Sequence, residues 1–195
     1  MTAPLPNDPT NTRAQLREIV NEKSLSIGPK ITLASGATSS FYFDMKPTIF
    51  DPEGSALISN LILDAIATDD PYYDRVGGME VGAIPIVATL GLRSWQRQRP
   101  IGGFFVRKQA KGHGAKRLVE GNLEAGMNIL IVEDVTTTGG SSLKAVHAVR
   151  DLGCTVSKVI TLVDRLEGAS ASFAAEGIEL LALLTTADFE IESAA

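Results

Sequence analysis

The apolar residues of this chain are arranged in two alternating patterns, which predict strands and helices in turn. Short β-branched and aliphatic runs such as residues 129–132, ILIV, have the length and composition of strands buried on both faces of a parallel sheet. Longer segments with apolar residues at helical spacing lie between them. The expected helices are Thr12–Lys23, Pro52–Ala67, Ile84–Gln98, Ser142–Leu152 and Ala169–Glu176. The expected strands are Lys30–Leu33, Phe41–Met45, Arg75–Met79, Gly102–Val106, Asn128–Glu133, Val156–Val163 and Ile178–Thr185.

This order of elements predicts an α/β fold with a central, mostly parallel sheet, helices on its faces and right-handed crossovers. We expect residues 12–50, which precede the regular alternation, to form most of a small hood over the sheet edge. Residues 1–11 are expected to be a disordered tail and residues 12–195 a single domain. The chain of 195 residues, 44% of them hydrophobic, is long enough for one substantial core.

The richest candidate for chemistry is the segment 129–142, ILIVEDVTTTGGSS. Its two acids follow the predicted strand, at the carboxyl edge where open α/β sheets bind ligands. The Thr- and Gly-rich residues after them offer hydroxyls and N–H groups that suit one phosphate, and adjacent carboxylates suit the cis hydroxyls of a ribose. The implied ligand is a ribose 5-phosphate. The candidate residues are Glu133, Asp134, Val135, Thr136, Thr137, Thr138, Gly139, Gly140 and Ser141.

A simpler interpretation of this segment is a solvated acidic strand end followed by a Ser-capped helix. That interpretation accounts for Ser141 or Ser142 as a cap. It does not account for adjacent acids followed by TTTGG.

The second unusual segment is basic. Residues 93–117 contain eight Lys and Arg and no Asp or Glu, a local charge of +8 in a chain of net charge −5, and this indicates a polyanionic ligand. Glycines on both sides of His113 predict a mobile loop that could act as a lid. Nucleic acid is a weaker alternative as the ligand, because the rest of the chain carries a net charge of −13 once this +8 is taken from the total. In addition, the aromatic residues Phe104 and Phe105 lie in a predicted strand rather than among the basic residues.

Together these segments resemble type I phosphoribosyltransferases, and residues 107–114, RKQAKGHG, resemble the catalytic loop of the orotate phosphoribosyltransferases. The resemblance implies transfer of ribose 5-phosphate from phosphoribosyl pyrophosphate (PRPP) to N1 of orotate, giving orotidine 5′-monophosphate and pyrophosphate in UMP biosynthesis. It implies that the leaving pyrophosphate is held by Arg107, Lys108, Lys111 and His113. The catalytic set it implies is Lys108, Lys111, His113 and Asp134. A transferase for another base and a PRPP-sensing regulator stay open as alternatives.

The same resemblance suggests a pocket for the pyrimidine ring. Residues 33–46 are similar to a family segment that closes over orotate, with Tyr42 and Phe43 at its aromatic positions, although period-2 aromatics also fit a half-buried strand. Arg165 matches an arginine that meets the orotate carboxylate, a pairing suited to its planar fork. Thr138 is a further orotate candidate.

Three positions are weaker candidates. Residues 76–92 resemble a pyrophosphate loop with Gly82 and Ala83 at its tip. Some orotate enzymes carry lysines where this chain has Ala34 and Gly82, so those roles do not transfer. Lys46 matches a basic position of other members and is a candidate replacement for the first lysine.

The expected cofactor is Mg²⁺, held mainly by PRPP, because a hard cation favours that cluster of oxygens. The resemblance implies a homodimer in which the basic loop serves the neighbouring site. A single cysteine, Cys154, cannot form an internal disulfide, and no stretch approaches the 18 apolar residues of a membrane span. We therefore expect a cytoplasmic enzyme with neither membrane nor nucleic acid as partner.

Overall fold

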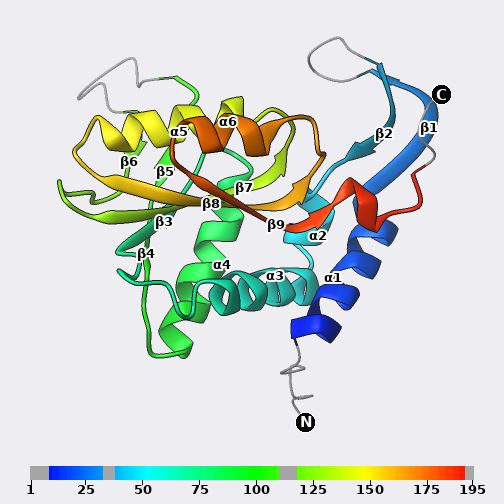
Figure 1. Ribbon diagram of the computed structural model, residues 1–195. Coiled ribbons are helices and arrows are strands. Elements are labelled where there is room, and N and C mark those ends of the chain that lie inside the picture. Colours follow the sequence, from blue (N-terminus) through cyan, green and yellow to red (C-terminus); the bar gives the residue numbers. More distant parts are fainter. Residues whose placement is uncertain (1–8, 33–37, 110–117, 192–195) are drawn as a thin grey trace.

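The computed structural model describes residues 9–32, 38–109 and 118–191, and its centre is a five-stranded parallel sheet (Figure 1). The strand order is β4-β3-β7-β8-β9. The first strand of this sheet in chain order, β3, therefore lies between the second, β4, and the third, β7, as in doubly wound α/β folds. The strands are β3 Arg75–Gly77, β4 Gly102–Gly103, β7 Asn128–Thr136, β8 Thr155–Asp164 and β9 Glu179–Thr185. The predicted α/β class with a parallel sheet is confirmed.

Helices cover both faces of this sheet (Figure 1). Helices α3 (Pro52–Ala65) and α4 (Ala83–Gln96) lie on one face, and α5 (Gly140–Arg150) and α6 (Ala169–Ala175) on the other. Two hydrophobic cores result, and β7 contributes to both by strict alternation. Leu130 and Val132 pack in the core of α3 and α4, whereas Ile129 and Ile131 pack in the core of α5 and α6.

The segment expected to form a hood contains a helix, a hairpin and a short helix. They are α1 (Pro9–Lys23), β1 (Leu25–Thr32), β2 (Thr38–Phe43) and α2 (Lys46–Ile49). Near the carboxyl terminus, the 3₁₀ turn η1 (Thr186–Asp188) follows β9. Helix α1 buries Leu16 and Val20 in the core that α3 and α4 share. Arg13 of α1 donates a hydrogen bond of 2.9 Å to the carbonyl of Leu183 and forms an ion pair with Asp188. Figure 1 shows the β1–β2 hairpin beyond β9.

Two element boundaries near the amino terminus differ from the expectation. Helix α1 begins at Pro9, so the last three residues of the expected tail are helical, since proline is well tolerated in a first helical turn; residues 1–8 lie outside the described part. Strand β1 begins at Leu25 and runs through Pro29, with a register shift between Ile27 and Ile31. A two-stranded ribbon accepts a proline at such an irregularity because each strand has a free edge.

The predicted strand Gly102–Val106 is divided between two sheets. Its first half is β4, and its second half, β5 (Phe105–Val106), pairs antiparallel with β6 (Val119–Glu120). This pairing partner lies thirteen residues further along the chain, so the local pattern could not indicate it. Neither β6 nor α2 was expected from the sequence.

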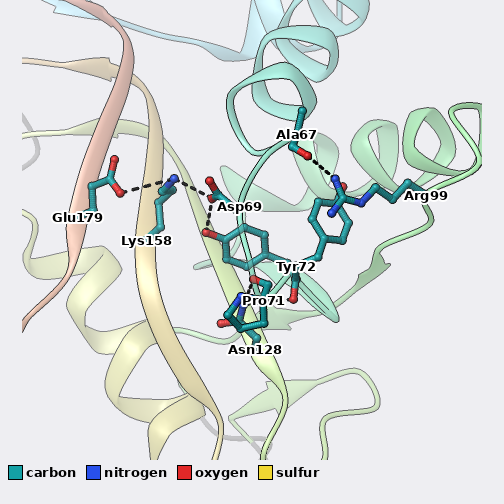
Figure 2. Close-up of polar contacts among 9 residues, drawn as sticks. Ala67, Asp69, Pro71, Tyr72, Arg99, Asn128, Lys158 and Glu179 are labelled. Carbon is teal, nitrogen blue, oxygen red and sulfur yellow. Dashed lines mark hydrogen bonds and ion pairs between the residues drawn. The ribbon is translucent and has the colours of Figure 1, made fainter.

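A polar network closes the amino edge of the sheet (Figure 2). Lys158 of β8, 8% exposed, contacts Asp69 at 2.7 Å and Glu179 of β9 at 3.5 Å. The hydroxyl of Tyr73 donates to the same Asp69 at 2.8 Å. Burial favours the neutral form of Asp69, but the bonds from Lys158 and Tyr73 outweigh it and hold the pKa of this carboxyl below its usual value. The network fastens the loop between α3 and β3 to the two strands, at the end of the sheet opposite the acidic pair.

Candidate functional site

The carboxyl edge of β7 and β8 carries the predicted acids and the predicted phosphate loop. Strand β7 extends to Thr136, three residues beyond its expected end, so both acids lie inside the strand. Helix α5 begins at Gly140, and its N-cap Gly139 has φ of 84°, the left-handed region that favours glycine. No side chain caps this helix, which leaves first-turn N–H groups for an anion.

The side chains of this loop differ in exposure. Thr136 is only 3% exposed and Gly139 is also buried, while Val135 and Thr137 are half-buried. Thr138, Gly140 and Ser141 are exposed. The hydroxyls that face solvent are therefore those of Thr138 and Ser141, two of the four that the sequence offered between Thr136 and Ser141.

Glu133 is the buried member of the acidic pair. It is 6% exposed and accepts a hydrogen bond of 2.6 Å from the hydroxyl of Ser142 in the first turn of α5. Burial raises the pKa of Glu133 to about 8 and the neighbouring Asp134 adds to the rise, while the bond from Ser142 opposes it. The raised pKa favours the protonated form of Glu133 near neutral pH. Ser142 is not the helix cap considered above, and no local pattern marks it as the partner of Glu133.

Asp134 projects toward the opposite face of the sheet. It is half-buried, and its Oδ1 accepts a hydrogen bond of 2.9 Å from the N–H of Val135. Gly82, the N-cap of α4, lies directly against it, because a Cβ added at Gly82 would fall 2.6 Å from the Asp134 carboxyl carbon. A lysine at this position would require the Asp134 side chain to shift. Ala83, the next residue, is fully buried in the core.

Lys46 lies close enough to this acid to interact with it. Its ammonium contacts Asp44 at 2.5 Å. This bond raises the pKa of Lys46, burial opposes the rise, and Tyr42 and Asp134 add lesser contributions to it. The side chain is 58% exposed. Of the weaker candidates, Gly82 thus lies against Asp134, whereas Lys46 pairs with Asp44 and interacts with Asp134 only weakly through its charge.

Arg165 follows the last residue of β8. Its side chain is only 7% exposed, its guanidinium carbon lies 4.5 Å from the centroid of the Phe41 ring, and Nη2 donates to the Ser39 hydroxyl at 3.3 Å. Its Nε lies 2.8 Å from Oε1 of Glu167. A buried arginine beside an aromatic ring and hydroxyls is suited to a planar anion.

The two aromatic candidates on β2 occupy different environments. Tyr42 is 40% exposed, whereas Phe43 is 4% exposed and packs in the core, 5.1 Å from the ring of Phe189 and 5.9 Å from Phe41. Phe43 therefore fits the alternative of a core residue. The aromatic ring that meets Arg165 is that of Phe41.

Three basic residues of segment 93–117 meet partners within the fold rather than facing a ligand. Arg93 and Arg97 bond to Asn60 on α3, and Arg99 lies over the Tyr72 ring at 3.4 Å and bonds to the carbonyl of Ala67 (Figure 2). Arg93 and Arg97, at the end of α4, thus meet α3, and Arg99 meets the loop that follows α3.

Arg107 is also neutralised within the fold. Its Nε donates to Glu120 at 2.9 Å, and Nη1 lies 4.0 Å from Glu80. The backbone N–H of Lys108 donates to Glu80 at 2.8 Å, while its side chain is exposed. Lys111 and His113 lie outside the described residues.

Over the described ranges, no cluster of three or more His, Cys, Asp or Glu is arranged to bind a metal ion. Asp134, half-buried at the carboxyl edge, offers a carboxylate of the kind that Mg²⁺ takes together with other oxygen ligands. Across the same part of the chain, none of the helices has the length and apolar character needed to span a membrane.

Comparison with known proteins agrees with this geometry. Residues 97–176 match the model of the phosphoribosyl transferase domain. The orotate phosphoribosyltransferase of Bradyrhizobium sp. (strain ORS 278) is 47% identical over 91% of this chain and 97% of its own.

Solved structures lead to the same family. The crystal structure of Mycobacterium tuberculosis H37Rv orotate phosphoribosyltransferase in complex with Fe(III) dicitrate has a TM-score of 0.79 and 39% identity, covering 92% of this chain and 99% of that one. The same enzyme in complex with PRPP has a TM-score of 0.75 and 38% identity, covering 91% and 98%. On this identity and coverage, the chain belongs to the orotate phosphoribosyltransferase family.

Proposed function

We propose that this protein is an orotate phosphoribosyltransferase of UMP biosynthesis, transferring ribose 5-phosphate from PRPP to N1 of orotate. The observation that carries the proposal is the meeting of three features at one sheet edge: the half-buried Asp134, the uncapped start of α5, and the buried Arg165. They suit, in order, ribose hydroxyls, a phosphate monoester and a ring carboxylate.

In this reaction the bond from C1 of the ribose to pyrophosphate breaks and a bond from C1 to N1 of orotate forms. Pyrophosphate leaves with the electron pair, and orotate loses its N1 proton. Positive charge develops on the ribose in such displacements. Asp134, as the less buried carboxylate of the pair, would hold a ribose hydroxyl and stabilise that charge. Glu133, held by Ser142, would fix the turn that carries the phosphate and reach the ribose only through its second carboxyl oxygen.

The 5-phosphate would bind the N–H groups and exposed hydroxyls of residues 137–141, at the positive end of the α5 dipole. The orotate carboxylate would meet Arg165, with Phe41 and Tyr42 lining the ring and Thr138 nearby as a proposed contact. Because Phe43 is buried in the core, Phe41 takes the place against the orotate ring that was expected for Phe43 from the sequence.

For the leaving pyrophosphate we propose Lys108, Lys111 and His113, on the resemblance of residues 107–114. Arg107 would contribute less, since Glu80 and Glu120 already neutralise it. Mg²⁺ bound with PRPP would supply further positive charge for the leaving pyrophosphate, and Asp134 is a carboxylate that could help to hold it. Gly82 and Ala83 would keep the loop between β3 and α4 close to this site.

We also propose a homodimer, which has support from an exposed apolar surface. Leu92 and Trp95 of α4 are 63% and 71% exposed and lie one helical turn apart. Beside them is a hollow of about 160 Å³ between α3 and α4, lined by Ser55, Ala56, Ser59, Thr89, Leu92, Arg93 and Gln96. Large exposed apolar residues beside a hollow favour association with another protein surface. The single, reduced Cys154 is consistent with the proposed cytoplasmic location.

The function is tested with a panel of bases, PRPP and Mg²⁺, with pyrophosphate release as the readout. We expect turnover of orotate and none of adenine, hypoxanthine or uracil, because these bases lack the carboxylate that Arg165 pairs with. A base without the carboxylate would leave the buried Nε–H of Arg165 without an aligned acceptor. A buried donor without a partner costs roughly 2 kcal/mol or more, which is a discrimination of about thirtyfold. Equal turnover of uracil and orotate would refute the proposal.

The shared site is tested by mixing two inactive variants. Lys111→Ala and Asp134→Asn should each be nearly inactive alone. If Lys111 serves the neighbouring subunit, a heterodimer has one site free of both changes, so mixing after mild dissociation should restore up to about half of the activity per heterodimer. Heterodimers verified by tag exchange that show no recovery would mean that Lys111 acts on its own subunit.

A further inference from the structure

The turn after β8 folds an acidic side chain back onto Arg165. Leu166 has φ of 60°, a left-handed conformation that is uncommon for a leucine. Oδ1 of Asp164 accepts a hydrogen bond of 2.9 Å from the N–H of Leu166 and thereby supports this conformation. The turn leaves Leu166 58% exposed and places Oε1 of Glu167 2.8 Å from Nε of Arg165. The backbone of this turn therefore determines that Glu167, two residues on, faces the arginine.

Arg165 does not need Glu167 to hold its position. Its backbone N–H donates to the carbonyl of Thr136 at 3.0 Å, and its own carbonyl accepts from the Thr186 hydroxyl at 3.3 Å. Its guanidinium rests on Phe41 and its Nη2 donates to Ser39. These contacts come from β7, η1 and β2, three separate elements, so the arginine is fixed by the fold around it.

The contact with Glu167 supplies charge without an aligned hydrogen bond. The Nε atom of Arg165 is fully buried, yet its N–H has no acceptor in line among the described residues, although the Glu167 oxygen lies only 2.8 Å away. Hydrogen bonds weaken steeply when the donor is misaligned. The Arg165 side chain is 7% exposed, whereas that of Glu167 is 42% exposed. One partner is thus buried and fixed, and the other lies at the surface and can turn away.

We propose that Glu167 is an internal counter-ion of Arg165 that the carboxylate of the substrate ring displaces. This rests on the proposed function, in which Arg165 receives that carboxylate. In the empty site Glu167 neutralises a buried cation that would otherwise be unpaired. During binding the incoming carboxylate gains the aligned Nε–H donor that Glu167 does not use. Glu167 therefore competes with every carboxylate ligand and sets the affinity of the site for the ring.

The proposal is tested with Glu167→Gln and with Glu190→Gln as the matched control, an exposed carboxylate away from Arg165. Exposed ion pairs are worth up to about 1 kcal/mol, so Glu167→Gln should lower the KM for orotate about twofold to fivefold. Its kcat and its KM for PRPP should stay unchanged. The inhibition constant of benzoate, a ring carboxylate without ring nitrogens, should fall by a similar factor. Glu190→Gln should match the parent in all four constants.

Other outcomes overturn the inference. A higher KM for orotate in a Glu167→Gln protein that melts like the parent would make Glu167 a positioning residue, and unchanged constants would mean that it does not compete. Glu167→Asp, which keeps the charge on a shorter side chain, should lie between Gln and the parent. If the parent itself does not turn over orotate, the proposed function fails and this inference falls with it. If the parent is active and Glu167→Gln equals it, only the inference fails.

Discussion

Replacing Glu133 with glutamine should change how the stability of the protein depends on pH. Glutamine has the same shape as a protonated glutamate, and its carbonyl oxygen can accept the hydrogen bond from Ser142. The variant therefore keeps the contact between β7 and α5 but cannot ionise. Any difference between the two proteins that varies with pH comes from the ionisation of Glu133.

The sign and size follow from the pKa of Glu133, which is about 8 in the fold against a usual value of 4.5. Because the folded pKa is the higher one, the folded state binds more protons than the unfolded state between these two values. The contribution of Glu133 is thus fully present below pH 4.5 and declines as the pH rises toward 8. At about 1.4 kcal/mol per pKa unit, the loss is on the order of 5 kcal/mol for this nearly buried group.

The free energy of unfolding should be measured by urea denaturation without ligands, between pH 5 and pH 9, for the parent, Glu133→Gln and Glu190→Gln. Near pH 5 the parent and Glu133→Gln should be similar. By pH 9 Glu133→Gln should be the more stable protein by several kcal/mol, while Glu190→Gln follows the parent throughout. A difference between parent and Glu133→Gln that is the same at pH 5 and pH 9 would refute the reasoning, since Glu133 would then hold no proton in the folded state.

The other variants probe the site and the opposite edge of the sheet. Gly82→Ala should lower kcat/KM by about tenfold to a hundredfold, because the new methyl group must displace the Asp134 carboxylate. Gly91→Ala on α4, whose new methyl group would lie 3.8 Å from its nearest neighbour, should keep full activity, and equal kinetics of the two would contradict the contact. Lys158→Ala should lower the free energy of unfolding by on the order of 3 kcal/mol with kcat unchanged, because Asp69 loses its main partner. The exposed Lys144→Ala is its control, and a loss below about 1 kcal/mol in Lys158→Ala would contradict the network's role.

The pattern of apolar residues was enough to predict the central strand and the residues that follow it at the carboxyl edge of the sheet. The run at residues 129–132 required a strand buried on both faces, and the two acids after it could only lie at the carboxyl edge of a parallel sheet. The pattern could also place Arg165 there, since it follows a similar run in β8.

Features that depend on distant partners could not be predicted. The division of the strand at Gly102–Val106 requires β6, and the burial of Glu133 depends on Ser142 in the next helix. A count of charges treated residues 93–117 as one patch, whereas Arg93 and Arg97 meet α3 and Arg107 meets Glu80 and Glu120. Charge adds along a sequence, but only folding decides which charges remain without a partner.

The alternation of β7 gives the acidic dipeptide a fixed order. Glu133 follows Ile129 and Ile131 on the face of α5, and Asp134 follows Leu130 and Val132 on the face of α4. The longer acid thus spans the distance to the helix that carries the phosphate turn, and the shorter one fits the narrow space against Gly82. Exchanging the two letters would leave composition, charge and hydropathy unchanged, yet it would give each face a carboxylate of the wrong length. Two neighbouring residues that look interchangeable in the sequence therefore belong to different layers of the protein.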